Sequence, residues 1–206
     1  MGLPSRTLWA TRNIDVTNAN GFAASDVQLN ASYFSWGNVD GHNANEGDFS
    51  PYDWGSGNDQ EPYVSSPGAS ISYPGSLDIT HDCARVLCGA PWSVPRSSDF
   101  DELLANCDFV DADGVVISGA DKRISIDGVY GIRLRSKING NILFLAACGQ
   151  ASGRTLSHGN ARGYYWTGTL RNEGSADVLF FHQSNVYASS PSDRYHGIQV
   201  RPIFRI

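Results

Sequence analysis

Residues 163–206 read GYYWTGTLRNEGSADVLFFHQSNVYASSPSDRYHGIQVRPIFRI, and this stretch decides the fold. Three of its segments have the β-branched and aromatic enrichment of half-buried strands: 164–170, 176–181 and 197–204. Between them, residues 172–174 and 185–195 are turn-rich and carry Tyr, His, Asn, Ser and Arg. Tyrosine gives a binding surface a large contact area with little loss of rotamer entropy. The stretch therefore predicts a binding face, with an ordinary antiparallel sheet and solvated loops as the alternative.

Composition limits the possible partners. A chain of 206 residues with 17% charged residues and a net charge of −6 is typical of one globular domain, and it has no basic stripe for a phosphate backbone. No segment has 18 apolar residues in a row, and no basic region followed by an apolar run marks a signal peptide. We expect a single domain over residues 1–206, the C-terminal part of a longer protein, with no nucleic-acid partner and no membrane insertion.

The first half of the chain predicts short strands and a long excursion. Residues 7–16 and 33–36 have strand character, whereas residues 37–77 are dominated by Gly, Asn, Asp, Ser and Pro. A structureless loop of this length is improbable in a compact domain. Buried aromatic rings would order it, and the candidates are Phe49, Tyr52, Trp54, Tyr63 and Tyr73.

Two short amphipathic helices follow, and then more strands. Thr80 is the expected cap of a helix that ends at Gly89, and Ser97 or Ser98 caps a second one. Strands are expected over 115–117, 124–126, 131–138 and 142–147. Asn139 and Gly140 give the strongest hairpin signal, that of a type I′ turn. This order predicts the α+β class, with two short helices on an antiparallel sheet and long loop excursions.

The four cysteines, Cys83, Cys88, Cys107 and Cys148, contain no C-x-x-C pair of the zinc-ribbon kind. The first three lie on predicted apolar helical faces, where a free thiol behaves as a small hydrophobic group. We expect buried, reduced thiols, and the even count leaves two disulfides as the alternative.

Five motifs in order resemble the landmarks of one family. They are GLPSRTLWATRN (2–13), YFSWGNVDGHN (33–43), HDCARVLCGAPWSVPRSSDFDELLANC (81–107), GYYWTGTL (163–170) and RYHGIQVRPI (194–203). The chain resembles the FISUMP domain, the Fibrobacter succinogenes major paralogous domain found in Bacteroidetes and their phages. The resemblance implies a C-type-lectin-like fold in which the N- and C-terminal strands pair and two helices pack beside a ligand-binding sheet.

The chain is also similar to the variable proteins of diversity-generating retroelements, of the major-tropism-determinant type. That similarity implies a fixed scaffold of Gly163, Trp166, Leu179, Arg194, Gly197, Val200, Arg201 and Pro202. The implied ligand-binding, changeable positions are Tyr164, Thr167, Thr169, Arg171, Asn172, Ser175, Asp177, His182, Ser184, Asn185, Tyr187, Tyr195, His196 and Gln199.

Alternation along the strands refines this set. If Ile198 and Val200 point to the core, then Gln199 points the other way. Tyr164 and Tyr165 likewise face opposite sides of their strand, and Tyr164 is the one expected to contact a ligand. Arg194 and Arg201 are expected to be structural, pairing with carboxylates or backbone carbonyls.

No cofactor is expected. Glu61 and Pro62, in QEPY, lack the following Asn or Asp of a lectin-type calcium loop. Two polar clusters also miss the twelve-residue calcium pattern and are expected to be turns and loop hydrogen bonds: Asp108, Asp111 and Asp113 with Gly114, and Asp40, His42, Asn43, Asn45 and Asp48.

Catalysis is not expected either. His81 and Asp82 are adjacent on a helix and point apart, no serine sits in a nucleophile elbow, and His158, His182 and His196 are scattered. The sequence thus predicts a non-enzymatic receptor-binding protein of a phage virion or bacterial cell surface. Its expected ligand is a cell-surface protein or glycan, and its parent protein would be oligomeric. A fixed-specificity surface adhesin or lipoprotein domain is the second hypothesis, and a carbohydrate-active or oxidising enzyme is the third.

Overall fold

The computed structural model describes residues 1–55 and 75–206. Within this part of the chain, 38% of the residues are strand and 8% are helix. The expected α+β class is therefore wrong, and the fold is β-rich with several antiparallel sheets. The reason is that segments expected as turns extend and pair, whereas the two described helices have only six and nine residues.

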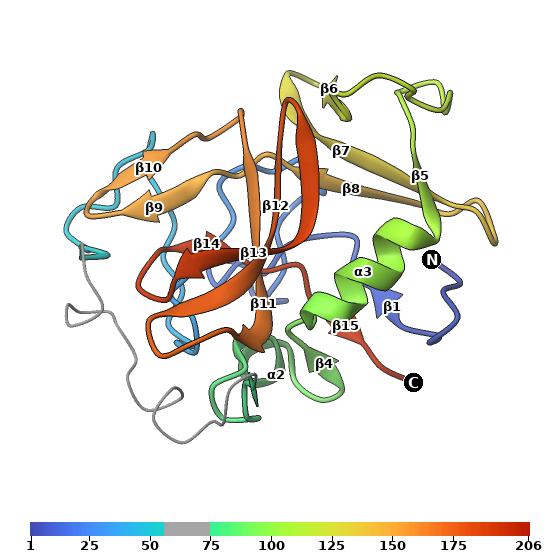
Figure 1. Ribbon diagram of the computed structural model, residues 1–206. Helices are drawn as coiled ribbons and strands as arrows, with labels where there is room; N and C mark the ends of the chain where they lie inside the picture. Colours follow the sequence, from blue (N-terminus) through green and yellow to red (C-terminus); the bar gives the residue numbers. More distant parts are fainter. Residues whose placement is uncertain (56–74) are drawn as a thin grey trace.

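β11 (Gly163–Leu170) is the central strand of the sheet with the order β13-β12-β11-β14-β2 (Figure 1). It pairs antiparallel with β12 and parallel with β14, and its last residues also pair with β3. The other strands of this sheet are β2 (Tyr33–Phe34), β3 (Gly75–Ser76), β12 (Ser175–His182), β13 (Asn185–Asp193) and β14 (Ile198–Gln199). Segments far apart in the sequence thus meet on β11.

β13 is the longest of the strands that the sequence did not predict, which also include β3 and four strands described below: β4, β5, β9 and β10. Residues 185–195 were expected to be turns, yet residues 185–193 pair with β12, from His182↔Asn185 to Ser175↔Asp193. The register shifts between Val178 and Phe180, and Pro191 lies within the strand. Proline is tolerated in sheets on edge strands, which is where β13 lies.

The second sheet is built on β7 (Val129–Ser136), which pairs with β5 (Cys107–Phe109), β6 (Arg123–Ile126) and β8 (Ile142–Ala146). The hairpin expected at Asn139 and Gly140 is present, but only Gly140 has a positive φ, of 76°, so the turn is not type I′. Asp127 and Gly128, with φ of 52° and 82°, form the two-residue turn between β6 and β7 instead.

The two ends of the chain meet in a small sheet. β1 (Leu8–Trp9) pairs with β15 (Ile203–Phe204), which also pairs with β4 (Trp92–Ser93). The expected pairing of N- and C-terminal strands is confirmed. The single strand expected over 197–204 is divided into β14 and β15, with Pro202 between them.

Both helices lie close to their expected positions. α2 (Cys83–Cys88) is capped by Asp82 and not by Thr80, because the Asp82 carboxylate accepts from the Arg85 N–H at 3.0 Å. α3 (Ser97–Ala105) buries Phe100 and Leu103, but its N-cap is Arg96, so the expected capping by Ser97 or Ser98 is wrong. Cys107 lies beyond its end, in β5, so the helical assignment of this cysteine was wrong.

The main sheet separates two cores. Tyr165, Leu179 and Phe181 pack with α3 and the second sheet, whereas Tyr164 and Trp166 pack on the other face with residues of β2 and α2. A third cluster contains Phe49 and Trp54, which confirms for residues 37–55 that aromatic rings anchor the loop-rich segment. This cluster lies near the hairpin of β9 (Gln150–Ser152) and β10 (Thr155–Ser157). Tyr63 and Tyr73 fall outside the described residues.

A buried polar network joins the N-terminal segment to the last strands. Arg201 is fully buried and donates to the Asn13 Oδ1 at 2.6 Å and to the Thr11 carbonyl at 2.7 Å. Asn13 in turn donates to Gln199, whose amide donates to the Leu29 carbonyl at 2.6 Å. Burial lowers the pKa of Arg201. Arg194 is also fully buried, donating to the Glu173 carbonyl, so the structural roles expected for both arginines are confirmed.

Removing this buried guanidinium should strongly destabilise the protein. Arg201→Ala leaves the Thr11 carbonyl and Asn13 without their donor, so the free energy of unfolding should fall by roughly 3 kcal/mol or more in urea denaturation. Arg154→Ala is the control, because Arg154 is 57% exposed in its pair with Asp53 and should contribute less than about 1 kcal/mol. Equal losses in the two variants would contradict the role of the network.

Gly163 should tolerate no side chain. A Cβ at this position would lie 2.0 Å from the ring of the fully buried Phe181. Gly163→Ala should lower the free energy of unfolding by about 1–3 kcal/mol through overpacking. Gly119→Ala, with open space around it, should change the free energy of unfolding by less than about 0.5 kcal/mol. Both variants can be measured by thermal denaturation, and an unchanged Tm for Gly163→Ala would refute this account.

Candidate ligand-binding face

A row of aromatic rings crosses the three strands at the edge of the main sheet. Tyr164 on β11 is opposite Phe180 on β12, which is opposite Tyr187 on β13. The ring centroids are 4.7 Å and 6.0 Å apart, and both pairs are stacked. His182, two residues along β12, lies 5.2 Å from Phe180. We call these four residues the aromatic row.

Exposure increases along the row towards the sheet edge. Tyr164 is 9% exposed, Phe180 and His182 are half-buried, and Tyr187 is 44% exposed. Ring stacking holds the tyrosine at the edge in a defined orientation, so less entropy is lost when a partner binds it. The row is therefore a preorganised apolar contact surface.

An open hollow of about 380 Å³ lies beside the row. Its lining comes from β9, β11, β12, β13 and the segment after β13: Gln150, Tyr164, Phe180, Ser190, Pro191, Ser192, Asp193 and His196. His196 Nδ1 lies 3.1 Å from the Ser192 hydroxyl. Burial lowers the pKa of His196, which favours the neutral imidazole at pH 7.

Four of the sequence-predicted contact residues lie on this face: Tyr164, His182, Tyr187 and His196. Tyr195 is half-buried, with its ring 4.4 Å from that of His196. Ser184 and Asn185, at the β12–β13 turn, line a separate depression beside Phe109 and Lys122. The predicted set is therefore only partly brought together.

Two predicted contact residues are fully buried and bonded within the protein. Gln199 points away from Ile198, as expected, but residues 29–31 cover it and it belongs to the buried network. The Thr167 hydroxyl donates to the Asp177 carbonyl at 2.8 Å. Neither side chain reaches the surface, so the assignment of both as ligand contacts is corrected.

The remaining predicted residues lie beyond the far end of the row, on the side of α3. The Ser97 hydroxyl donates to the Asp177 carboxylate, and the Ser97 N–H donates to Thr169. Arg171 pairs with Asp177 at 2.6 Å. Ser175 is 9% exposed, and the exposed Asn172 accepts from the Ser175 N–H in a turn. Thr169 and Asp177 therefore join α3 to the sheet.

Five residues that line the hollow were not predicted as ligand contacts from the sequence: Phe180, Ser190, Ser192, Asp193 and Gln150. The alternation of Phe180 with His182 places both on one face, and this signal was available. The serines and Asp193 were missed because residues 185–195 were not recognised as a strand. Gln150 comes from the β9–β10 hairpin, and nothing in the sequence connects it to β13.

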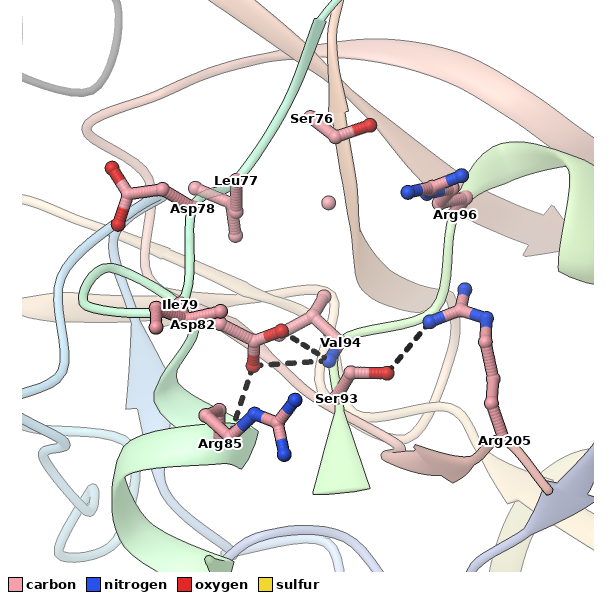
Figure 2. Close-up of a pocket in the computed structure, with 11 residues that line it drawn as sticks. Ser76, Leu77, Asp78, Ile79, Asp82, Arg85, Ser93, Val94, Arg96 and Arg205 are labelled. Carbon is pink, nitrogen blue, oxygen red and sulfur yellow. Dashed lines mark hydrogen bonds between the residues drawn. The ribbon is translucent and has the colours of Figure 1, made fainter. Parts of the chain in front are cut away.

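A second hollow, of about 200 Å³, lies between α2, β3 and β4 (Figure 2). Figure 2 shows the buried Asp82 carboxylate bonded to the backbone N–H groups of Val94 and Arg85. Arg205 donates to Ser93 and pairs with Asp99 at 2.6 Å. The Asp82 carboxylate and the Arg205 guanidinium are thus engaged within the protein, and the hollow lies at the junction between α2 and β4.

Several of the candidate cation and acid/base residues lie in the described part of the chain. No group of three or more His, Cys, Asp or Glu there could hold a metal ion, and Asp111 accepts from the Asp113 and Val115 N–H groups in a turn. Glu61 and Pro62 fall outside this part. His81 pairs with Asp78 at 2.8 Å in the turn before α2, so the expected placing of His81 on the helix is wrong.

The four cysteines are free thiols, which confirms the expected reduced state. Cys83, Cys107 and Cys148 are buried, and Cys88 is half-buried. Burial raises the pKa of Cys88, Cys107 and Cys148 to about 11, so their thiolates are disfavoured at neutral pH.

No helix in residues 1–55 or 75–206 is long and apolar enough to cross a bilayer. Comparisons of the chain with protein-family models, with curated proteins and with solved structures find no match.

Proposed function

We propose that this chain is a non-enzymatic ligand-binding domain that recognises a cell-surface protein or glycan through the aromatic row and the adjoining hollow. The observation that carries the proposal is the stacked series Tyr164, Phe180 and Tyr187, which ends in a half-exposed tyrosine. Binding surfaces concentrate their energy in a few such rigid aromatic anchors, with adaptable polar groups around them. Ser190, Ser192 and Asp193 are those polar groups here.

The chemistry of the hollow supports binding over catalysis. Ser192 and His196 are as close as a nucleophile and its base, but within the described residues no group bonds His196 Nε2 to orient the imidazole. The cysteine thiols are disfavoured as nucleophiles by their raised pKa values. The face therefore has contact area without an assembled catalytic group.

The biological setting that we propose is a phage virion or a bacterial surface, with the chain acting as a receptor-binding protein of the retroelement-diversified type. The five motifs that resemble the FISUMP domain support this setting. Several copies on an oligomeric parent protein would raise a weak single-site affinity through multivalency.

Loss of the exposed tyrosine should weaken attachment to cells. Tyr187→Ala removes the accessible end of the row, so binding of the labelled chain to a panel of bacterial cells should fall by about tenfold or more in flow cytometry. Tyr130→Ala is a matched control, because Tyr130 is 45% exposed on β7 and Tyr187 is 44% exposed. Equal binding by the two variants would count against the proposed face.

Natural variation should follow exposure if the region is diversified. In deep sequencing of codons 160–206 across the source population, substitutions should gather at His182, Asn185 and Tyr187. Gln199 and Thr167 should stay constant, because each is fully buried and hydrogen-bonded. A uniform sequence would favour an adhesin of fixed specificity, and frequent changes at Gln199 would contradict the structural role given to it here.

A further inference from the structure

The hollow has the size and the walls of a small-ligand site. Its volume of about 380 Å³ falls in the range of about 300–1,000 Å³ that is usual for such sites. Tyr164 and Phe180 contribute apolar ring surface to its lining, and β13 contributes the polar side chains of Ser190, Ser192 and Asp193. Apolar ring surface beside hydrogen-bonding groups matches a ligand with one apolar and several polar faces.

Tyr164 brings an uncommitted hydroxyl to the hollow. The residue is 9% exposed, and its hydroxyl makes no hydrogen bond within the described residues. The oxygen is not among the fully buried polar atoms that lack a partner, so solvent reaches it. Tyr164 lines the hollow, so a ligand there would replace water as its hydrogen-bond partner.

Two more polar side chains of the hollow are uncommitted. The Ser190 hydroxyl and the Gln150 amide make no side-chain hydrogen bonds in the described part of the chain. Together with the Tyr164 hydroxyl they offer several donors and acceptors within one cavity. A ligand with many hydroxyl groups would satisfy them together.

The charge of the residues that line the hollow further restricts the chemical class of ligand that it would bind. Its single charged side chain is the exposed Asp193, and neither lysine nor arginine is among its lining residues in the described part. Anionic groups such as carboxylates, sulfates or phosphates are therefore disfavoured by repulsion. A carboxylate accepts hydrogen bonds from hydroxyl groups, so Asp193 suits a neutral polyhydroxylated ligand.

We propose that the hollow holds one neutral pyranose unit of a surface glycan, with its apolar face on Tyr164 and Phe180 and its hydroxyl groups on Tyr164, Ser190, Gln150 and Asp193. This inference rests on the proposed function, because it names the ligand class of the same face. A lysine side chain of a surface protein is the competing occupant, since it would also find aromatic ring surface beside a carboxylate.

The first experiment is a glycan array probed with the full chain and printed with neutral, sialylated and sulfated glycans. Binding should be confined to neutral glycans and should be inhibited by the free methyl glycoside of their terminal sugar. No glycan binding, or a preference for sialylated or sulfated glycans, would overturn the inference. Stronger binding to lysine-rich surface proteins that no sugar inhibits would assign the hollow to a protein side chain.

Point variants then test whether individual side chains of the hollow contact the sugar. Tyr164→Phe removes only the unpaired hydroxyl and should weaken glycan binding about 2- to 10-fold, whereas Tyr130→Phe, the same change outside the face, should leave it unchanged. Asp193→Asn should also weaken it. Thermal denaturation verifies that each variant is folded.

The two proposals fail differently. If Tyr187→Ala abolishes cell binding but Tyr164→Phe and Asp193→Asn leave it intact, the ligand-binding face stands and the pyranose assignment is wrong. If none of the three changes binding to cells or glycans, the proposed function itself is wrong.

Discussion

The structure depends on a buried arginine that joins its two ends. Arg201 donates to Asn13 and to the carbonyls of residues 10 and 11, and Asn13 continues the network to Gln199. A buried guanidinium is tolerated only where acceptors surround it, so its position fixes the path of the N-terminal segment over the last strands. The pairing of β1 with β15 and the placing of β14 beside β11 are consistent with this constraint.

The two faces of β11 have different roles. One of its faces, through Tyr165, packs into the core shared with α3 and the second sheet. The other face carries Tyr164, where the aromatic row begins. The rigid side holds the accessible side in register, because neighbouring residues of one strand cannot shift independently. The proposed ligand contacts therefore rest on a strand that is anchored from behind.

Much of the frame was predictable from the sequence, and the site was predictable only in part. β-Propensity predicted strands over 164–170 and 176–181, each within one or two residues of the observed bounds. Arg194 and Arg201 were also correctly expected to be structural. Alternation gives the side to which a residue points, but not whether another segment covers that side. Gln199 shows the difference, since residues 29–31 bury it. β13 escaped prediction because an exposed edge strand needs few apolar residues, so its composition is that of a loop.

The proline in β13 has a consequence for how copies of this domain behave together. An edge strand presents unpaired backbone groups on which another chain can continue the sheet, and this is a common route to aggregation. Pro191 has no N–H, and Asp193 adds a charge near the end of the same strand. Both features interrupt the ladder that an incoming strand would need. Many copies could therefore be displayed at high density without polymerising through their sheet edges.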